Sequence, residues 1–87
     1  MSTKSEAEKE KTRLQEVFSM LKIKESKKAR EFYEFAHNYF KDGLYFFEKQ
    51  KFLQAFEAFV ISWSYIDAGL KLEFFSVPQE QKKWFTA

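Results

Sequence analysis

The sequence contains very few residues that break helices. Only two glycines and one proline occur among its 87 residues, so the chain has few positions at which it can turn sharply. Its apolar side chains recur at offsets of three and four, which is the spacing of one face of a helix, and not at the offset of two that marks a strand. Together these features predict an all-α fold.

The apolar pattern divides the chain into three helical segments. Residues 1–12 are polar and extend the first helix, but they have little to bury. Ser26 is predicted to cap the second helix, because its hydroxyl can accept a hydrogen bond from a free backbone N–H. Val77 and Pro78 are predicted to end the third helix, since proline disfavours helical geometry in the residue before it. The apolar stripes of the first and third segments are Leu14, Val17, Phe18 and Leu21, and Phe52, Phe56, Phe59, Trp63, Ile66, Leu70 and Phe74.

Short connections between consecutive helices favour antiparallel neighbours. The sequence therefore predicts an up-down-up antiparallel three-helix bundle in residues 13–76, with a tail in residues 77–87. In the tail, Trp84 and Phe85 are too apolar to be left in water, so they either fold back on the bundle or dock on a partner.

Composition limits the class of protein. The chain is 45% hydrophobic and 21% aromatic, with 12 phenylalanines, which is enough apolar surface for a compact core in a small domain. It has no cysteine, so no disulfide or thiolate metal site is possible, and a cytoplasmic location is the simplest expectation. Its apolar runs are too short to span a membrane. No membrane association, metal or cofactor is expected.

The longest resemblance to a known family lies in the segment AHNYFKDGLYFFEKQKFLQAFEAFVISWSYIDAGLKLEFF. This segment, about the C-terminal half of the chain, resembles the archaeal domain-of-unknown-function family 357. The resemblance implies a three-helix bundle with no assigned activity. The chain departs from the family pattern at the turn, where Glu48-Lys49-Gln50-Lys51 replaces a Gly-Asp-like sequence. The residues that carry the resemblance are Ala55, Trp63, Ile66, Asp67, Ala68, Gly69 and Leu70.

Asp67 is the most unusual residue of the third helix, because it borders an apolar stripe. If the hairpin turns near Gln50, facing residues have numbers that sum to about 100, so Asp67 would lie level with Tyr33. One hypothesis is a polar cleft formed by Arg30, Tyr33, His37 and Asp67. The alternative is a structural carboxylate paired with Tyr33, Arg30 or Lys71. Gly69 would then allow close helix approach.

The polar cleft gives little support to an enzyme. Asp67 and His37 could in principle act as acid and base, and the Arg30/His37 spacing resembles the Arg/His motif of the HEPN ribonucleases. However, the pair lies on an earlier helix than in that family, and the chain has only one histidine. No catalytic residue is therefore predicted.

Two further surfaces are candidates for binding. A basic pole consists of Lys22, Lys24, Lys27, Lys28 and Arg30, which could attract phosphate backbones or could simply be a solvated turn. An aromatic interface would use Phe35, Tyr45 and Tyr65, which flank their stripes, together with Trp84 and Phe85; long lysine stems could instead cover these rings. The leading hypothesis is a non-catalytic interaction module that binds a protein partner or a second copy of the chain. The alternative is a nucleic-acid-binding or RNA-processing domain that uses the basic pole.

Overall fold

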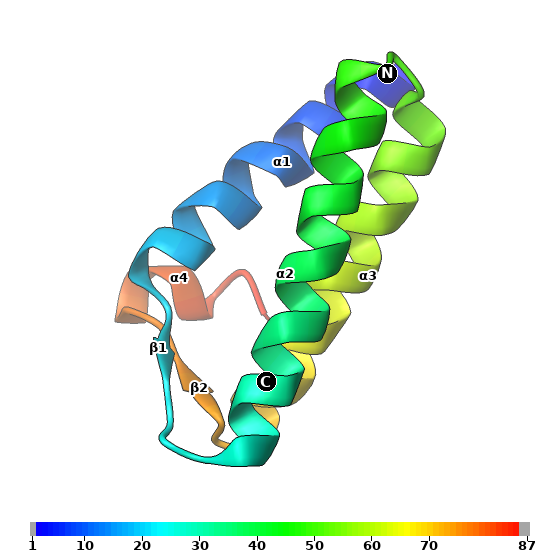
Figure 1. The fold of residues 1–87 in the computed structure, drawn as a ribbon. Coiled ribbons are helices and arrows are strands. Elements are labelled where there is room, and N and C mark those ends of the chain that lie inside the picture. Colours follow the sequence, from blue (N-terminus) through cyan, green and yellow to red (C-terminus); the bar gives the residue numbers. More distant parts are fainter. Residues whose placement is uncertain (1, 86–87) are drawn as a thin grey trace.

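The computed structural model describes residues 2–85 and shows a predominantly helical protein. Three long helices, α1 (Thr3–Met20), α2 (Lys27–Glu48) and α3 (Phe52–Lys71), pack against one another (Figure 1). A two-stranded sheet of β1 (Lys22–Ile23) and β2 (Phe75–Ser76) and a short helix α4 (Gln79–Lys82) are added to them. The predicted helical fold is confirmed at this level. The regular up-down-up bundle stays a prediction. The sheet and α4, which the sequence did not indicate, are additions to the three long helices.

The α2–α3 hairpin begins and turns through local hydrogen bonds. The Ser26 hydroxyl accepts from the backbone N–H of Ala29 at 3.0 Å, which confirms the predicted N-cap. At the other end Gln50 takes a left-handed conformation with φ 62°. Its N–H bonds the carbonyl of Phe47 at 3.0 Å, and the N–H of Lys51 bonds that of Phe46 at 2.9 Å. This pair of bonds is the Schellman ending of a helix, which usually places glycine at the left-handed position.

Two close contacts hold α2 and α3 together. Gly43 lies directly against the ring of Phe59, which is fully buried. The hydroxyl of Ser62, also fully buried, donates to the carbonyl of Ala36 at 2.6 Å. A residue with a side chain at position 43 would push the helices apart, so glycine is required there for packing rather than for a turn.

The third helix ends earlier than the sequence predicts, at Lys71 and not at Val77-Pro78. Glu73 adopts a left-handed conformation with φ 61°, and the N–H of Phe74 bonds the carbonyl of Gly69 at 2.8 Å. The ring of Phe75 then folds back onto Gly69. Gly69 therefore makes room for this ring rather than for a neighbouring helix, and the chain reverses without needing the proline.

The reversal brings β2 beside the segment that follows α1. Lys22 pairs with Ser76 and Ile23 with Phe75 in an antiparallel register. The N–H of Lys24 also bonds the carbonyl of Phe74 at 2.8 Å. The connection between α1 and α2 is thus tied to the end of α3.

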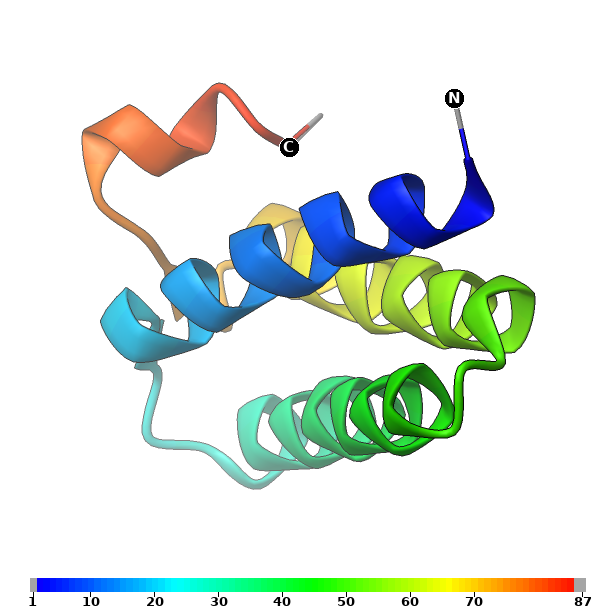
Figure 2. The ribbon, with the colours of Figure 1, turned by 90° about the horizontal axis from the view of Figure 1, so that it is seen from above.

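Helix α1 lies across the hairpin and is closer to α3 than to α2 (Figure 2). Its fully buried side chains are Ala7, Leu14 and Val17. Among residues 2–12, which were predicted to have little to bury, only Ala7 is fully buried. With Phe59 and Ile66 of α3, these side chains form the centre of the core. Within residues 2–85, none of the helices combines the length and apolar character that a membrane span requires.

Candidate functional site

A row of aromatic rings lies on the side of the α2–α3 hairpin that the helical spacing places away from α1. Phe35 and Tyr39 come from α2, and both stack on Tyr65 of α3, with centroids 5.3 and 5.9 Å apart and interplanar angles of 18° and 15°. Phe32 meets Tyr65 edge-on at 6.1 Å. Phe35 keeps 50% of its surface exposed to water. We call Phe35, Tyr39 and Tyr65 the aromatic flank.

The aromatic flank continues into a groove between the two helices. The groove is shallow and open, with a volume of about 290 Å³, and it shares Tyr39 with the flank. Its floor includes Ala58, and its rim carries the carboxylates of Asp42 and Glu57. Neither carboxylate takes part in an ion pair within the described residues. We call this the outer groove; its lining is Tyr39, Asp42, Phe46, Gln54, Glu57, Ala58 and Ile61.

The structure brings together only part of the predicted polar cleft. Tyr33 and His37 stack on each other, with centroids 5.6 Å apart and an interplanar angle of 13°. Phe18 of α1 meets both rings edge-on, at 5.8 and 5.5 Å. These two polar rings therefore line the α1–α2 contact, where they pack as aromatic surfaces.

Asp67 lies level with Tyr33 along the hairpin, as predicted, but on a different side of α3 from Tyr65. The Ser62–Ala36 hydrogen bond confirms that facing residues sum to about 100. Asp67 is half-buried and interacts with another group of the protein. It lies about 200° around α3 from Tyr65, at 3.6 residues per turn. It shares the side of Trp63. Arg30 is exposed at the start of α2. Participation of Asp67 and Arg30 in a common site with His37 stays a prediction.

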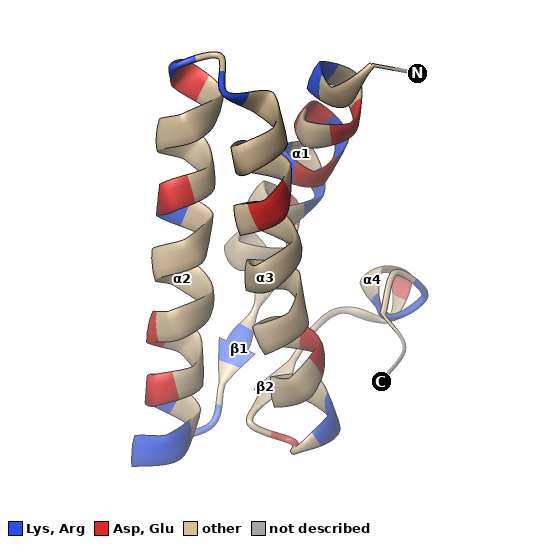
Figure 3. Ribbon diagram, turned by 90° about the vertical axis from the view of Figure 1, so that its right-hand side faces the viewer, with Lys and Arg blue, Asp and Glu red and all other residues tan. Residues whose placement is uncertain are grey.

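The basic pole is exposed along its whole length. Lys22, Lys24, Lys27, Lys28 and Arg30 are all exposed, and Figure 3 shows the lysine and arginine segments of β1 and of the first turn of α2 near the same end of the molecule. The first turn of α2 contains no acidic residue. Positive side chains there oppose the helix dipole, which favours anions at this end.

The remaining predicted interface residues are Tyr45, which is exposed, and Trp84 and Phe85, which are half-buried. Tyr45 is 57% exposed, with the ammonium of Lys49 5.7 Å from its ring centroid. Trp84 and Phe85 are half-buried and pack against the core, so the tail folds back on the protein. Sequence reasoning missed Tyr39 and Ile61. Their spacing of four from Phe35 and Tyr65 was the signal that could have placed them on the same face.

The part of the chain that the structure describes contains no group of three or more His, Cys, Asp or Glu side chains placed to hold a metal ion. What the fold presents is a small helical domain with an ordered row of rings at its surface. The chain belongs to the family described as Protein of unknown function (DUF357), whose sequence model matches residues 6–75, and this confirms the predicted family. No curated protein and no solved structure matches the chain.

Proposed function

We propose that this protein is a non-catalytic protein-binding module that acts through the aromatic flank and the outer groove. The observation that carries the proposal is the half-exposed ring of Phe35, held in place by stacking on Tyr65 at 5.3 Å. Ordered aromatic rings lose little conformational entropy on binding, and they are enriched at the centres of protein interfaces. A location in the cytoplasm is part of the proposal and rests on the absence of cysteine.

The shape of the site favours a helix as the bound element. Two antiparallel helices with an apolar groove between them accept the apolar face of a third helix. Asp42 and Glu57 on the rim of the groove would attract lysine or arginine side chains that flank such a face. A second copy of the chain remains the alternative occupant.

Site-specific photocrosslinking tests the proposal directly. A photoreactive amino acid replaces Tyr39, which belongs to both the flank and the groove, in the full chain expressed in its source cells. The control places the same group at Lys41, an exposed residue of α2 that lies about 200° around the helix from Tyr39 and so points to the other side. We expect one defined protein adduct from position 39 and none from position 41. Identical adducts from both positions, or none from either, would refute the proposal.

A second candidate function is binding of nucleic acid at the basic pole. It is favoured by five exposed cations around the α2 N-terminus, where the peptide groups also attract anions. Fluorescence anisotropy with labelled single-stranded RNA should then show affinity that falls steeply with salt. The double variant Lys27→Gln with Lys28→Gln should reduce both the affinity and the salt slope. Affinity unchanged in that variant would remove this candidate.

A further inference from the structure

The tail, residues 77–85, covers a second apolar surface, which lies on the α1–α3 side of the protein. The ring of Phe85 stacks on Trp63 of α3, with centroids 4.3 Å apart and an interplanar angle of 10°. The guanidinium of Arg13 in α1 lies 5.8 Å from the ring centroid of Trp84. In α4, the side-chain amide of Gln81 donates to the carbonyl of Glu16 in α1 at 3.3 Å. We call the surface under the tail, formed by Arg13, Glu16 and Trp63, the tail groove.

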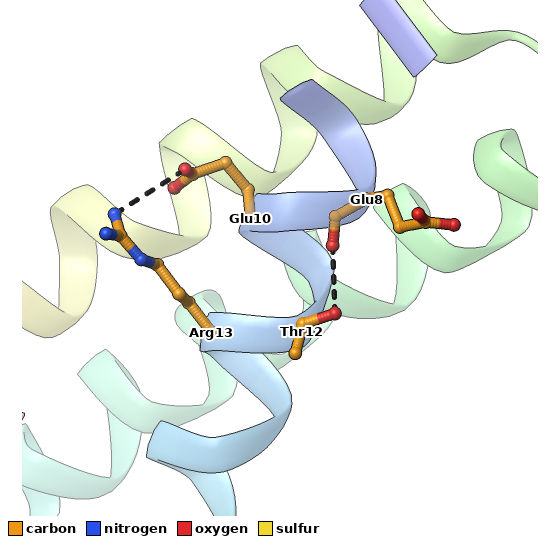
Figure 4. Close-up of polar contacts among 4 residues, drawn as sticks. All are labelled: Glu8, Glu10, Thr12 and Arg13. Carbon is orange, nitrogen blue, oxygen red and sulfur yellow. Dashed lines mark hydrogen bonds and ion pairs between the residues drawn. The ribbon is translucent and has the colours of Figure 1, made fainter. Parts of the chain in front are cut away.

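The arginine of the tail groove lies beside an acidic residue of its own helix. Arg13 Nη1 lies 4.0 Å from Glu10 Oε2, one turn earlier on α1 (Figure 4). Both side chains are partly exposed, at 39% and 17%. The guanidinium remains accessible to an aromatic ring from outside the helix.

The tail is attached to this groove by few contacts. Every backbone hydrogen bond of residues 78–85 among the described residues stays within the tail itself. Gln81 is 6% exposed, yet its Oε1 atom has no hydrogen-bond partner there. A buried acceptor without a partner disfavours the docked state, because the same atom would be hydrated after release. Such a segment can open without unfolding the rest of the protein.

The tail also leaves space beneath it. A cavity of about 420 Å³ separates the tail from the end of α3 and from β2. Leu70 and Phe75 contribute apolar walls, and Lys82 and Phe85 line it from the tail side. A segment of slightly different sequence could therefore fill the site better than the tail does.

The groove and its cover differ in their relation to the family. The family match extends over residues 6–75, so it includes Arg13, Glu16 and Trp63 but not the tail. The residues of the tail groove therefore lie within the region that the family model matches, and the tail lies outside it. This surface becomes available to other segments whenever the tail is displaced.

We propose that the tail groove is a docking site for a short segment of a partner protein that carries two adjacent aromatic side chains after basic residues. The chain's own tail, with the sequence Lys82-Lys83-Trp84-Phe85, shows which chemistry fits. One ring stacks on Trp63, the other receives the guanidinium of Arg13, and an amide donor reaches the carbonyl of Glu16. In the resting protein the tail occupies the site and competes with the partner segment.

Competition within one chain has a measurable consequence. A covalently attached segment acts at an effective concentration in the millimolar range when its connection is short. A free segment must overcome this local competitor, so the intact protein should bind it weakly. Removing the two aromatic side chains of the tail should strengthen the binding of the same free segment by at least tenfold.

The experiment uses the full chain and a fluorescein-labelled peptide with the tail sequence PQEQKKWFTA. Fluorescence anisotropy is measured with the wild-type protein and with the double variant Trp84→Ala with Phe85→Ala. We expect at least tenfold tighter binding to the double variant and no binding of a peptide in which both rings are alanine. Trp63→Ala, added to the double variant, should abolish binding of the labelled peptide.

Two outcomes of the affinity measurement would overturn the proposal. They are equal affinity for the wild type and the double variant, and binding that survives Trp63→Ala. A wild-type dimer that Trp63→Ala converts to monomer would also overturn it, because the groove would then hold the tail of a second copy. If circular dichroism shows that the double variant has lost its helices, the single variant Phe85→Ala replaces it. This variant leaves the ring of Trp63 free, and it must still bind the peptide more tightly than the wild type does.

Discussion

Replacing Gly43 by alanine tests how the two helices of the hairpin are packed. A Cβ atom at position 43 would lie 3.0 Å from Cζ of Phe59 and closer still to two other carbons of that ring. Phe59 is 0% exposed and touches the ring of Phe40, with centroids 6.0 Å apart. The ring is therefore enclosed and has no free space into which it can move.

The expected magnitude combines two opposing effects. Alanine is favoured over glycine inside a helix by about 1 kcal/mol. Overpacking an enclosed core costs about 1–3 kcal/mol, and we take the upper part of that range because three atoms of one buried ring are affected. Gly43→Ala should therefore lower the free energy of unfolding by about 2 kcal/mol. Urea denaturation followed by far-ultraviolet circular dichroism measures this as a lower midpoint at an unchanged slope.

Two comparisons separate the packing effect from helix propensity. Asn38→Ala, at an exposed position of the same helix, should raise stability by a few tenths of a kcal/mol through propensity alone. Leucine has no atoms equivalent to Cε1 and Cζ of phenylalanine, so the cost of Gly43→Ala should fall by more than half in a Phe59→Leu background. A Gly43→Ala protein as stable as the wild type would refute the packing argument, as would the same cost in both backgrounds.

Three further predictions concern the ends and the interior of the hairpin. Gln50→Gly and Glu73→Gly should each raise the free energy of unfolding by about 1 kcal/mol, because both positions have positive φ; lower urea midpoints would contradict this. Ser26→Ala should lower it by about 1 kcal/mol by removing the N-cap of α2, and an unchanged midpoint would show that the cap is energetically neutral. Ser62→Ala should lower it by about 1 kcal/mol, since the buried hydroxyl bonds the carbonyl of Ala36; thermal unfolding of the two proteins side by side would reveal any smaller effect.

The candidate site shows how far the sequence could be interpreted. Phe35 and Tyr65 were predicted as interface residues because they flank their apolar stripes, and the structure stacks them on each other. The level of Asp67 along the hairpin was also predictable, because consecutive antiparallel helices fix which residues are level. Its side of the helix was not, since a rule based on level contains no information about rotation around the helix axis. The rule placed Tyr33 and His37 at the level of Asp67, whereas in the structure their rings contact Phe18 of α1.

The sequence by itself determined the helices, because the spacing of apolar residues and the cap at Ser26 act over a few neighbouring positions. Only the tertiary structure decided where α3 ends and where the tail lies. Helix α3 stops at Lys71 and Glu73 turns left-handed, and the Phe75 ring packs onto Gly69, a contact that exists only once the chain has reversed. The strands β1 and β2 have two residues each, too few for a periodic pattern. The position of Phe85 depends on Trp63, which is distant in the sequence and adjacent only in the folded protein.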